Sequence, residues 1–166
     1  MRFLGSRRSI APLGAAAAAI LCVAALIAAA NAGAGSDVPF KGTDSFASKA
    51  VGGSGNIVKT LDTGSGNATH LGRFTMAASE TVDFGTLAVT GGTYTLTAAN
   101  GDTVTGIYSG HILPTLDGYL VSGPITGGTG RFTGATGFIV WHGSFDLATF
   151  TGSDVITGTI SSVGAL

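Results

Sequence analysis

Beyond residue 35 the chain is a succession of short threonine-rich segments separated by glycine, such as residues 92–97 (GTYTLT) and residues 157–160 (TGTI). The branched β-carbon of threonine suits an extended strand, and glycine is common where a strand bends or reverses. No window in this region shows the 3.6-residue period of a helix. The pattern therefore predicts an all-β domain of many short antiparallel strands.

Turn-forming residues divide this region into eight candidate strands. The Asn100-Gly101 pair between two alternating runs is a strong hairpin signal, and Gly91-Gly92 marks another turn. Pro114 ends a strand, because proline cannot donate a hydrogen bond to the ladder. The predicted strands are residues 57–61, 68–77, 82–89, 93–98, 103–111, 119–125, 138–145 and 154–161.

A run of consecutive hairpins favours a closed barrel, because an open sheet would leave two unpaired edges. Glycines inside the predicted strands support closure, since barrels use them to bend strands and to bring backbones close together. These glycines are Gly72, Gly85, Gly106, Gly143 and Gly158. We predict an eight-stranded antiparallel up-and-down β-barrel preceded by a signal peptide, with a two-sheet sandwich as the alternative.

The first residues predict export. Arg7 and Arg8 form part of a basic start, residues 10–30 are almost entirely apolar, and Ala30-Asn31-Ala32 fits a cleavage site with small residues. This order is typical of a signal peptide, with a retained membrane helix as the alternative. We predict a signal peptide at residues 1–34, a leader segment at residues 35–55 and one barrel domain at residues 56–166. The protein would then be secreted, periplasmic or part of the cell envelope.

Charge and cysteine content exclude several kinds of function. Five basic and nine acidic residues follow residue 35, so the exported part carries a net charge of about −4 and has no basic patch for nucleic acid. The single cysteine, Cys22, lies in the predicted signal peptide. The barrel domain therefore has no disulfide, no catalytic thiol and no cysteine-ligated metal. We predict no cofactor, and a monomer or a small homo-oligomer.

One segment resembles a known family. Residues 126–137 (TGGTGRFTGATG), followed by residues 145–149 (FDLAT) and 157–161 (TGTIS), are similar to small exported bacterial proteins of the allene oxide cyclase-like and dirigent-like barrel group. Residues 70–74 (HLGRF) look like that group's first core strand. The resemblance covers residues 56–162 and implies an eight-stranded barrel with a central cavity. The plant relatives carry out or guide the cyclisation of reactive lipid- or phenol-derived intermediates, but no catalytic position carries over to this chain.

Alternation along the predicted strands selects the side chains that face the interior. The larger apolar sets nominate four residues with polar tips as ligand-binding residues of the lumen: His70, Tyr94, Tyr108 and Trp141. The alternative is that these are core residues with a satisfied N–H or O–H. An eight-stranded barrel is only wide enough for its own side chains or for one small ligand.

The remaining polar residues carry weaker predictions. His70, His111 and His142 lie on three strands but show no local metal-ligand spacing, so we predict no metal site. Glu80 and Asp83 could divide acid and base roles, but their place near a turn predicts a solvated rim. No catalytic residue is assigned.

A second pair of polar residues comes from a short repeat. Arg73 and Arg131 occupy equivalent places in two Gly-Arg-Phe-Thr sequences. We expect them to pair with rim carboxylates such as Asp83 or Asp146, in a purely structural role.

Three functions remain open at this point. The first is binding of a small apolar ligand in the lumen. The second is an isomerase or cyclase of the resembled kind, in which holding the substrate in one conformation does much of the work. The third is a structural envelope protein with a packed core. An open lumen favours the first, and a carboxylate or tyrosine inside the lumen is required by the second.

Overall fold

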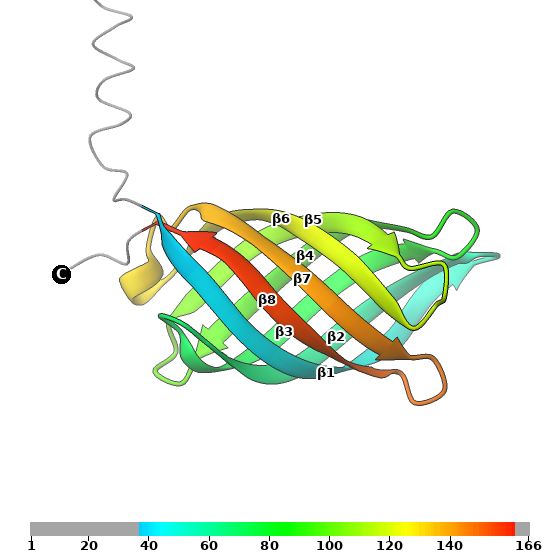
Figure 1. Cartoon of the computed structure of the whole chain (residues 1–166), viewed down its shortest axis with the longest axis horizontal. Coiled ribbons are helices and arrows are strands. Elements are labelled where there is room, and N and C mark those ends of the chain that lie inside the picture. The colour runs from blue at the N-terminus through cyan, green and yellow to red at the C-terminus, as the bar shows by residue number, and fades with distance from the viewer. Residues whose placement is uncertain (1–36, 162–166) are drawn as a thin grey trace, which may run out of the picture. The chain divides into compact units, whose positions relative to one another are not determined.

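The computed structural model describes residues 37–161, and the predicted signal peptide lies outside them. The chain forms a closed barrel of eight antiparallel strands in sequence order, as predicted (Figure 1). The elements are β1 (Val38–Ser54), β2 (Ile57–Ala68), β3 (Gly72–Asp83), β4 (Ala88–Ala98), β5 (Thr103–Ile112), β6 (Gly118–Gly128), the 3₁₀ helix η1 (Gly130–Phe132), β7 (Gly137–Asp146) and β8 (Thr151–Ile160). Within the described part, no helix is long and apolar enough to cross a membrane.

The number of strands was predicted correctly, but two assignments were wrong. The predicted leader at residues 35–55 is not separate from the barrel, because it contains β1, which pairs with β2 and with β8. Every second residue of β1 faces inward, but this set includes Gly42, Asp44 and Ser48 beside the phenylalanines, which hides the apolar alternation. The domain boundary predicted at residue 56 is therefore wrong.

The strand predicted at residues 82–89 does not exist. Strand β3 ends at Asp83 and β4 begins at Ala88, and the residues between them form a turn. Asp83 holds this turn, because its Oδ1 accepts hydrogen bonds from the backbone N–H of Gly85 at 2.8 Å and of Thr86 at 3.3 Å. A short side chain that accepts bonds from the following backbone favours a turn over a strand.

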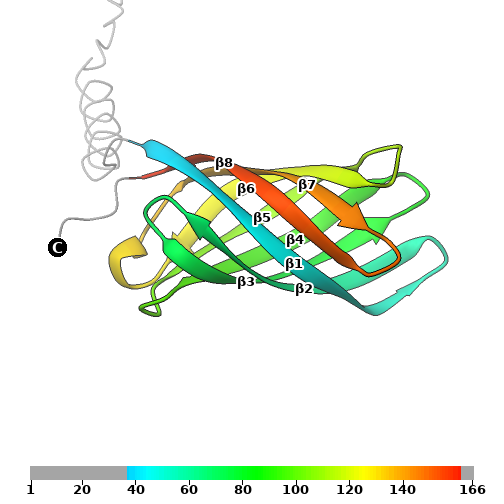
Figure 2. The same ribbon diagram turned by 60° about the horizontal axis from the view of Figure 1, so that its bottom comes forward.

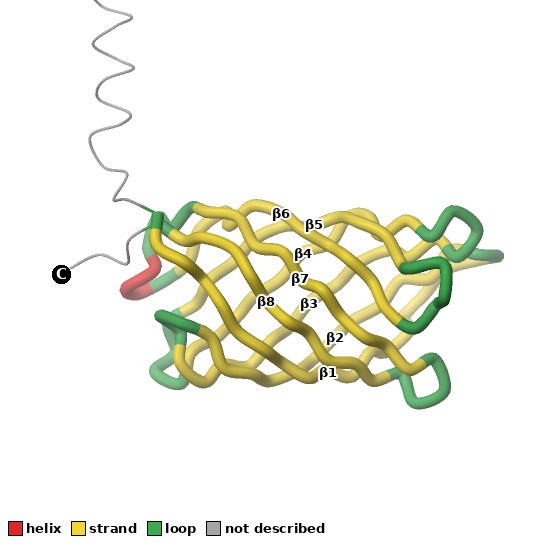
Figure 3. The backbone as a smooth tube through the Cα atoms, viewed as in Figure 1, coloured by secondary structure: helices red, strands yellow, loops and turns green. Residues whose placement is uncertain are grey.

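Strands β1 and β8 close the barrel (Figure 2). They pair from Val38 opposite Ile160 to Ala47 opposite Thr151. The up-and-down topology places alternate connections at opposite ends, so loops gather at both ends (Figure 3). The end at which β1 begins holds the β2–β3, β4–β5 and β6–β7 connections, and we call it the closed end. The other holds the β1–β2, β3–β4, β5–β6 and β7–β8 connections, and we call it the open end.

Glycines inside the strands make room for aromatic rings on the neighbouring strand. Three of the five predicted mid-strand glycines lie within strands: Gly106, Gly143 and Gly158. Gly72 instead starts β3, and Gly85 lies in a turn. The predicted turn at Gly91-Gly92 is an irregularity inside β4, where the register with β5 shifts.

The glycine–aromatic pairs face each other directly across the ladder. A Cβ on Gly92 would lie 2.5 Å from the Tyr108 ring, and one on Gly143 would lie 2.3 Å from the Tyr119 ring. Real Cβ atoms do not approach other atoms so closely, so these positions require glycine. The pairs are Gly66 with Phe74, Gly92 with Tyr108, Gly106 with Tyr94, Gly143 with Tyr119, and Gly152 with Phe46.

The half of the barrel near the closed end is a packed apolar core. Its side chains come from the inward positions of the strands and from η1, which places Phe132 in the core with only 1% of its surface exposed. The largest fully buried side chains are Phe40, Leu96, Val104, Phe132, Ile139, Ile156 and Ile160. Burial of such side chains contributes roughly 1.5–3 kcal/mol each to folding before entropy is counted, so this half holds the fold together.

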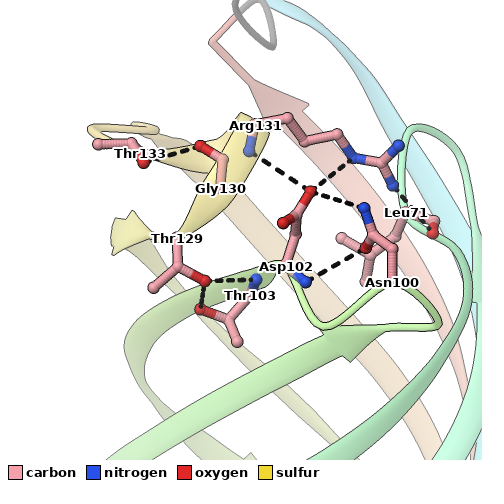
Figure 4. Close-up of polar contacts among 8 residues, drawn as sticks. All are labelled: Leu71, Asn100, Asp102, Thr103, Thr129, Gly130, Arg131 and Thr133. Atoms are coloured by element: carbon pink, nitrogen blue, oxygen red, sulfur yellow. Dashed lines mark hydrogen bonds and ion pairs between the residues drawn. The ribbon is translucent and has the colours of Figure 1, made fainter.

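Polar contacts tie the loops of the closed end to one another (Figure 4). The Arg131 guanidinium lies 3.7 Å from Asp102 Oδ2 and donates a hydrogen bond to the Leu71 carbonyl oxygen at 3.3 Å. Three connections therefore meet at one side chain. The predicted partners of Arg131 were wrong, because Asp83 and Asp146 border connections of the open end.

Candidate functional site

The half of the barrel near the open end contains a cavity of about 280 Å³. Inward-facing residues from all eight strands line it, and so do residues of three open-end loops. The cavity wall divides into two parts by residue type. Strands β4 to β7 contribute most of the aromatic rings, and strands β2, β3 and β8 contribute the carboxyl groups.

Three of the four predicted lumen residues come together in the aromatic wall. The Tyr94 and Trp141 rings meet edge to face with centroids 4.8 Å apart, and Tyr108 lies 6.4 Å from Tyr94 and 5.9 Å from Trp141. All three line the cavity. The alternation of β4, β5 and β7 was sufficient to place them inside. Their role as ligand-binding residues stays a prediction.

His70 was placed wrongly. Because β2 extends to Ala68 and β3 begins at Gly72, His70 falls in the turn between them at the closed end, with an exposed side chain and a φ of 65°. Its Nε2 lies 3.2 Å from the Pro39 carbonyl oxygen. The other histidines, His111 and His142, are also exposed. In the part of the chain that the structure describes, no three histidine, cysteine or acidic side chains could hold a metal ion.

The sequence prediction missed an acidic cluster inside the barrel. Its members are Asp44, Asp62, Glu80 and Asp154. The prediction of a solvated rim was wrong for Glu80, because β3 runs on to Asp83 and turns Glu80 inward beside Ala78 and Val82. The alternation that selected the aromatic residues would have found the cluster if polar residues had been kept in the inward sets.

The cluster consists of two carboxyl pairs from neighbouring strands. Asp44 of β1 lies directly opposite Asp154 of β8. Burial, with the adjacent Asp154 charge as the second cause, raises the pKa of Asp44 to about 8. Burial and the charge of Asp62 likewise raise the pKa of Glu80 to about 8. Asp44 and Glu80 therefore keep their protons at neutral pH, as expected when two carboxyl groups share one site.

Hydroxyl groups donate to the carboxylates from across the barrel wall. Tyr108 on β5 extends over Gly92 of β4 and donates to Glu80 of β3. Tyr119 on β6 extends over Gly143 of β7 and donates to Asp154 of β8 at 2.6 Å. Burial raises the pKa of both phenols, so they stay protonated and act as donors. Gly92 and Gly143 leave space for these two tyrosine side chains, whose hydrogen bonds join the aromatic wall to the acidic wall.

Polar groups of three residues deep in the barrel lack such a donor or acceptor: Asp44, Thr60 and Tyr94. Tyr94 is only 3% exposed and lines the cavity, but no described residue forms a hydrogen bond with its hydroxyl group. Asp44 is 6% exposed, and no N–H or hydroxyl group reaches its carboxyl oxygens. Buried polar groups almost always have a partner. Tyr94 lines the cavity, whereas Asp44 does not, so the Tyr94 hydroxyl group indicates a place where another molecule could supply a partner.

Exposed apolar side chains surround the opening of the cavity. Phe84, Leu116, Leu147 and Phe150 lie in the loops of the open end, and Phe150 is 46% exposed. Leu116 and Phe150 have φ values of 60° and 56°, in the left-handed region that is uncommon for bulky residues. Such backbone strain is often found at binding sites. The Phe150 ring contacts Phe145 edge to face at 6.2 Å, which anchors the rim to β7.

Comparison with known proteins identifies no relative. No protein-family model, no curated protein and no solved structure matches this chain. The resemblance to the allene oxide cyclase-like and dirigent-like group therefore stays a prediction.

Proposed function

We propose that this protein is exported and binds a small, mostly apolar ligand in the cavity at the open end of its barrel. The observation that carries the proposal is the contrast between a fully packed half and a half that holds an aromatic-lined cavity of about 280 Å³. Ligand sites are typically concave, largely apolar and equipped with a few polar groups. An exposed apolar rim gives such a ligand a route from water into the barrel.

The size of the cavity supports a ligand of small-metabolite dimensions, because it lies near the lower limit of typical binding pockets. A structural envelope protein was expected to have a packed core, and the cavity gives that alternative no support. Export, the absence of a nucleic-acid partner and a monomeric or small homo-oligomeric state remain parts of the proposal. Resemblance to the allene oxide cyclase-like and dirigent-like barrels adds a consistent expectation of a central cavity.

The test uses Trp141, which is the only tryptophan of the chain and lines the cavity. The neutral probe N-phenyl-1-naphthylamine should bind with saturation, change Trp141 fluorescence and raise the melting temperature. Ala78→Phe fills the cavity from β3 and should abolish binding. The matched control, Ala77→Phe, adds the same ring to the exposed face of the same strand and should leave binding unchanged. Equal binding by both variants would contradict the proposal.

One observation favours an isomerase or cyclase as a second candidate. Glu80 lines the cavity, accepts a hydrogen bond from Tyr108 and has its pKa raised to about 8 by burial. A carboxyl group of this kind could give a proton to a substrate and take it back, which an isomerisation requires.

For this candidate, the purified protein is incubated with a reactive unsaturated fatty-acid epoxide. The isomerised or cyclised product should be enriched in one enantiomer. This enrichment should be lost with Glu80→Gln and retained with the control Asp83→Asn, which lies on the same strand. A racemic product identical to that formed in buffer would exclude this activity for that substrate class.

A further inference from the structure

We propose that the ligand of the barrel is an organic cation, with an apolar body and a positively charged amine or quaternary ammonium group. This inference rests on the proposed function, because it names the class of ligand that the same cavity would take. The positive group would lie between the acidic wall and the aromatic wall.

The acidic wall has no compensating charge in the barrel. Asp62, Glu80 and Asp154 line the cavity, and Asp44 lies beside Asp154. All five basic residues of the described chain have exposed side chains. They are Lys41, Lys49, Lys59, Arg73 and Arg131. Asp44 and Glu80 keep their protons at neutral pH, so Asp62 and Asp154 are the acidic groups of the cavity that are left to pair with a cation. Acidic side chains are rarely buried unless they are paired with a positive group, and a cationic ligand would provide that missing partner.

The carboxylates also have free capacity to accept hydrogen bonds. Tyr108 donates to Glu80, Tyr119 to Asp154 and Ser48 to Asp62, and every one of these donors is a neutral hydroxyl group. A carboxylate has about four lone-pair sites, so one donor leaves room for an ammonium N–H. The neutral donors orient Asp62 and Asp154 without cancelling their charge, whereas Glu80 keeps its proton.

The opposite wall suits the same ligand. Trp141, Tyr94 and Tyr108 lie within 6.4 Å of one another and line the cavity. Aromatic faces attract cations, with tryptophan the strongest, and clusters of such rings recognise quaternary ammonium groups.

A buried group without a partner provides an independent indication that something else occupies this space. The Tyr94 hydroxyl belongs to a side chain that is 97% buried and lines the cavity, but it has no partner in the described structure. A ligand that carries a polar group could supply that partner.

The geometry favours an organic cation over a metal ion. No three acidic or histidine side chains of residues 37–161 converge closely enough to hold a metal. Large apolar surfaces also line the cavity, including Val82, Val89 and Ile112. A bare metal ion would leave these surfaces without contacts, whereas an aliphatic or aromatic ligand body would cover them.

The test compares three ligands of one shape by calorimetry at pH 7: 4-phenylbutylamine, which is positively charged, 4-phenylbutan-1-ol, which is neutral, and 4-phenylbutanoate, which is negatively charged. The amine should bind at least about tenfold more tightly than the alcohol, in the range expected for a cation near aromatic rings and carboxylates. The acid should bind more weakly than the alcohol, because like charges repel.

Substitutions identify the residues that cause the preference for the amine over the alcohol. Asp62→Asn combined with Asp154→Asn should reduce the preference for the amine to about threefold or less, while alcohol binding is retained. The control is Asp83→Asn, which removes a carboxylate from the same end of the barrel but outside the cavity, and it should keep the full preference. If the double variant does not fold, Trp141→Leu tests the aromatic wall and should also reduce the preference.

The outcomes separate this inference from the proposed function. Equal affinity for amine and alcohol in the unmodified protein would overturn the cationic ligand but leave an apolar binding site. Tighter binding of the acid would overturn it as well. If neither these ligands nor the neutral probe bind, the proposed function itself fails.

Discussion

The two halves of the barrel interior are built from the same strands but from different side chains. Near the closed end, the inward positions carry apolar residues such as Phe40 and Ile156, which pack without a cavity. Near the open end, inward positions of the same strands β1 and β8 carry Ser48 and Asp154, and the space between the walls stays open. The comparison shows that one end of a barrel can supply the stability while the other end holds a binding cavity. This is possible because a strand needs only part of its inward face to form a core.

The largest effect should come from opening the packed half. Phe40→Ala removes a side chain with no exposed surface and should lower the free energy of unfolding by about 3–5 kcal/mol. Phe84→Ala removes the same ring from the rim, where it is 37% exposed, and should cost less than about 1 kcal/mol. Urea unfolding monitored through Trp141 measures both. Similar losses of unfolding free energy in the two variants would mean that the rim is as important for stability as the core.

A methyl group placed under a bridging tyrosine should have the next largest effect. In Gly143→Ala the new Cβ would lie 2.3 Å from the Tyr119 ring and 2.4 Å from Asp154 Oδ1. The two walls must then separate, which should cost about 1–3 kcal/mol as overpacking does elsewhere. Gly52→Ala is the control, because nothing lies within 4 Å of a Cβ there. Unfolding curves that coincide for the two variants would contradict the bridge across the barrel.

The acidic wall should make stability depend on pH in an unusual direction. The folded-state pKa values of Asp44 and Glu80 are raised to about 8, above the unfolded values of 3.8 and 4.5. The folded state therefore binds more protons between these limits, and its stability falls as pH rises from 5 to 8. We expect a loss of at least about 1 kcal/mol over this range.

A substitution isolates this pH effect. Asp44→Asn removes one of the two groups, so its melting temperature should fall less between pH 5 and pH 8 than that of the unmodified protein. Asp83→Asn should not change the slope in this window, because the pKa of Asp83 is lowered and its contribution is lost only in acid. A melting temperature that rises toward pH 8 in the unmodified protein would contradict the protonated pairs.

The smallest effect should come from the loops of the closed end. Arg131→Ala removes the ion pair with Asp102 and the hydrogen bond to Leu71, and should cost up to about 1 kcal/mol because the ion pair is partly exposed to water. Arg73→Ala changes the equivalent residue of the other Gly-Arg-Phe-Thr sequence, and should be neutral within about 0.5 kcal/mol. The free energy of unfolding in urea distinguishes them. A larger loss for Arg73→Ala would show that the contacts around Arg131 do not stabilise these loops.

Local sequence patterns predicted the parts of the barrel that have regular alternation. Tyr94, Tyr108 and Trp141 lie inside because each occupies an inward position flanked by apolar residues on its own strand. The prediction failed for β1, whose inward set mixes Phe40 and Phe46 with polar residues. It failed for His70 because the position of a turn cannot be fixed to within a residue or two from composition, and a small shift changes the face of a side chain.

The two Gly-Arg-Phe-Thr sequences show the same limit. Gly72 and Gly130 both have positive φ values, of 70° and 58°, and both lie at the closed end. The first sequence nevertheless begins β3, whereas the second contains η1. Four identical residues do not fix one structure, because pairing with other segments decides whether a chain extends or turns.

The sequence by itself determined that the chain is all-β and built of consecutive hairpins, and it favoured a closed barrel over a two-sheet sandwich. These properties depend on turn signals and on a two-residue alternation, which are local and can be read along the chain. The count of eight strands agreed only because the missed β1 and the extra strand at residues 82–89 cancel. The acidic cluster was decided only by the tertiary structure. Closure brings β1 beside β8 and places Asp44 opposite Asp154, although they lie near opposite ends of the described chain. The environment of a carboxyl group depends on such neighbours in space, so its charge, and the ligand it could attract, follow from the folded barrel.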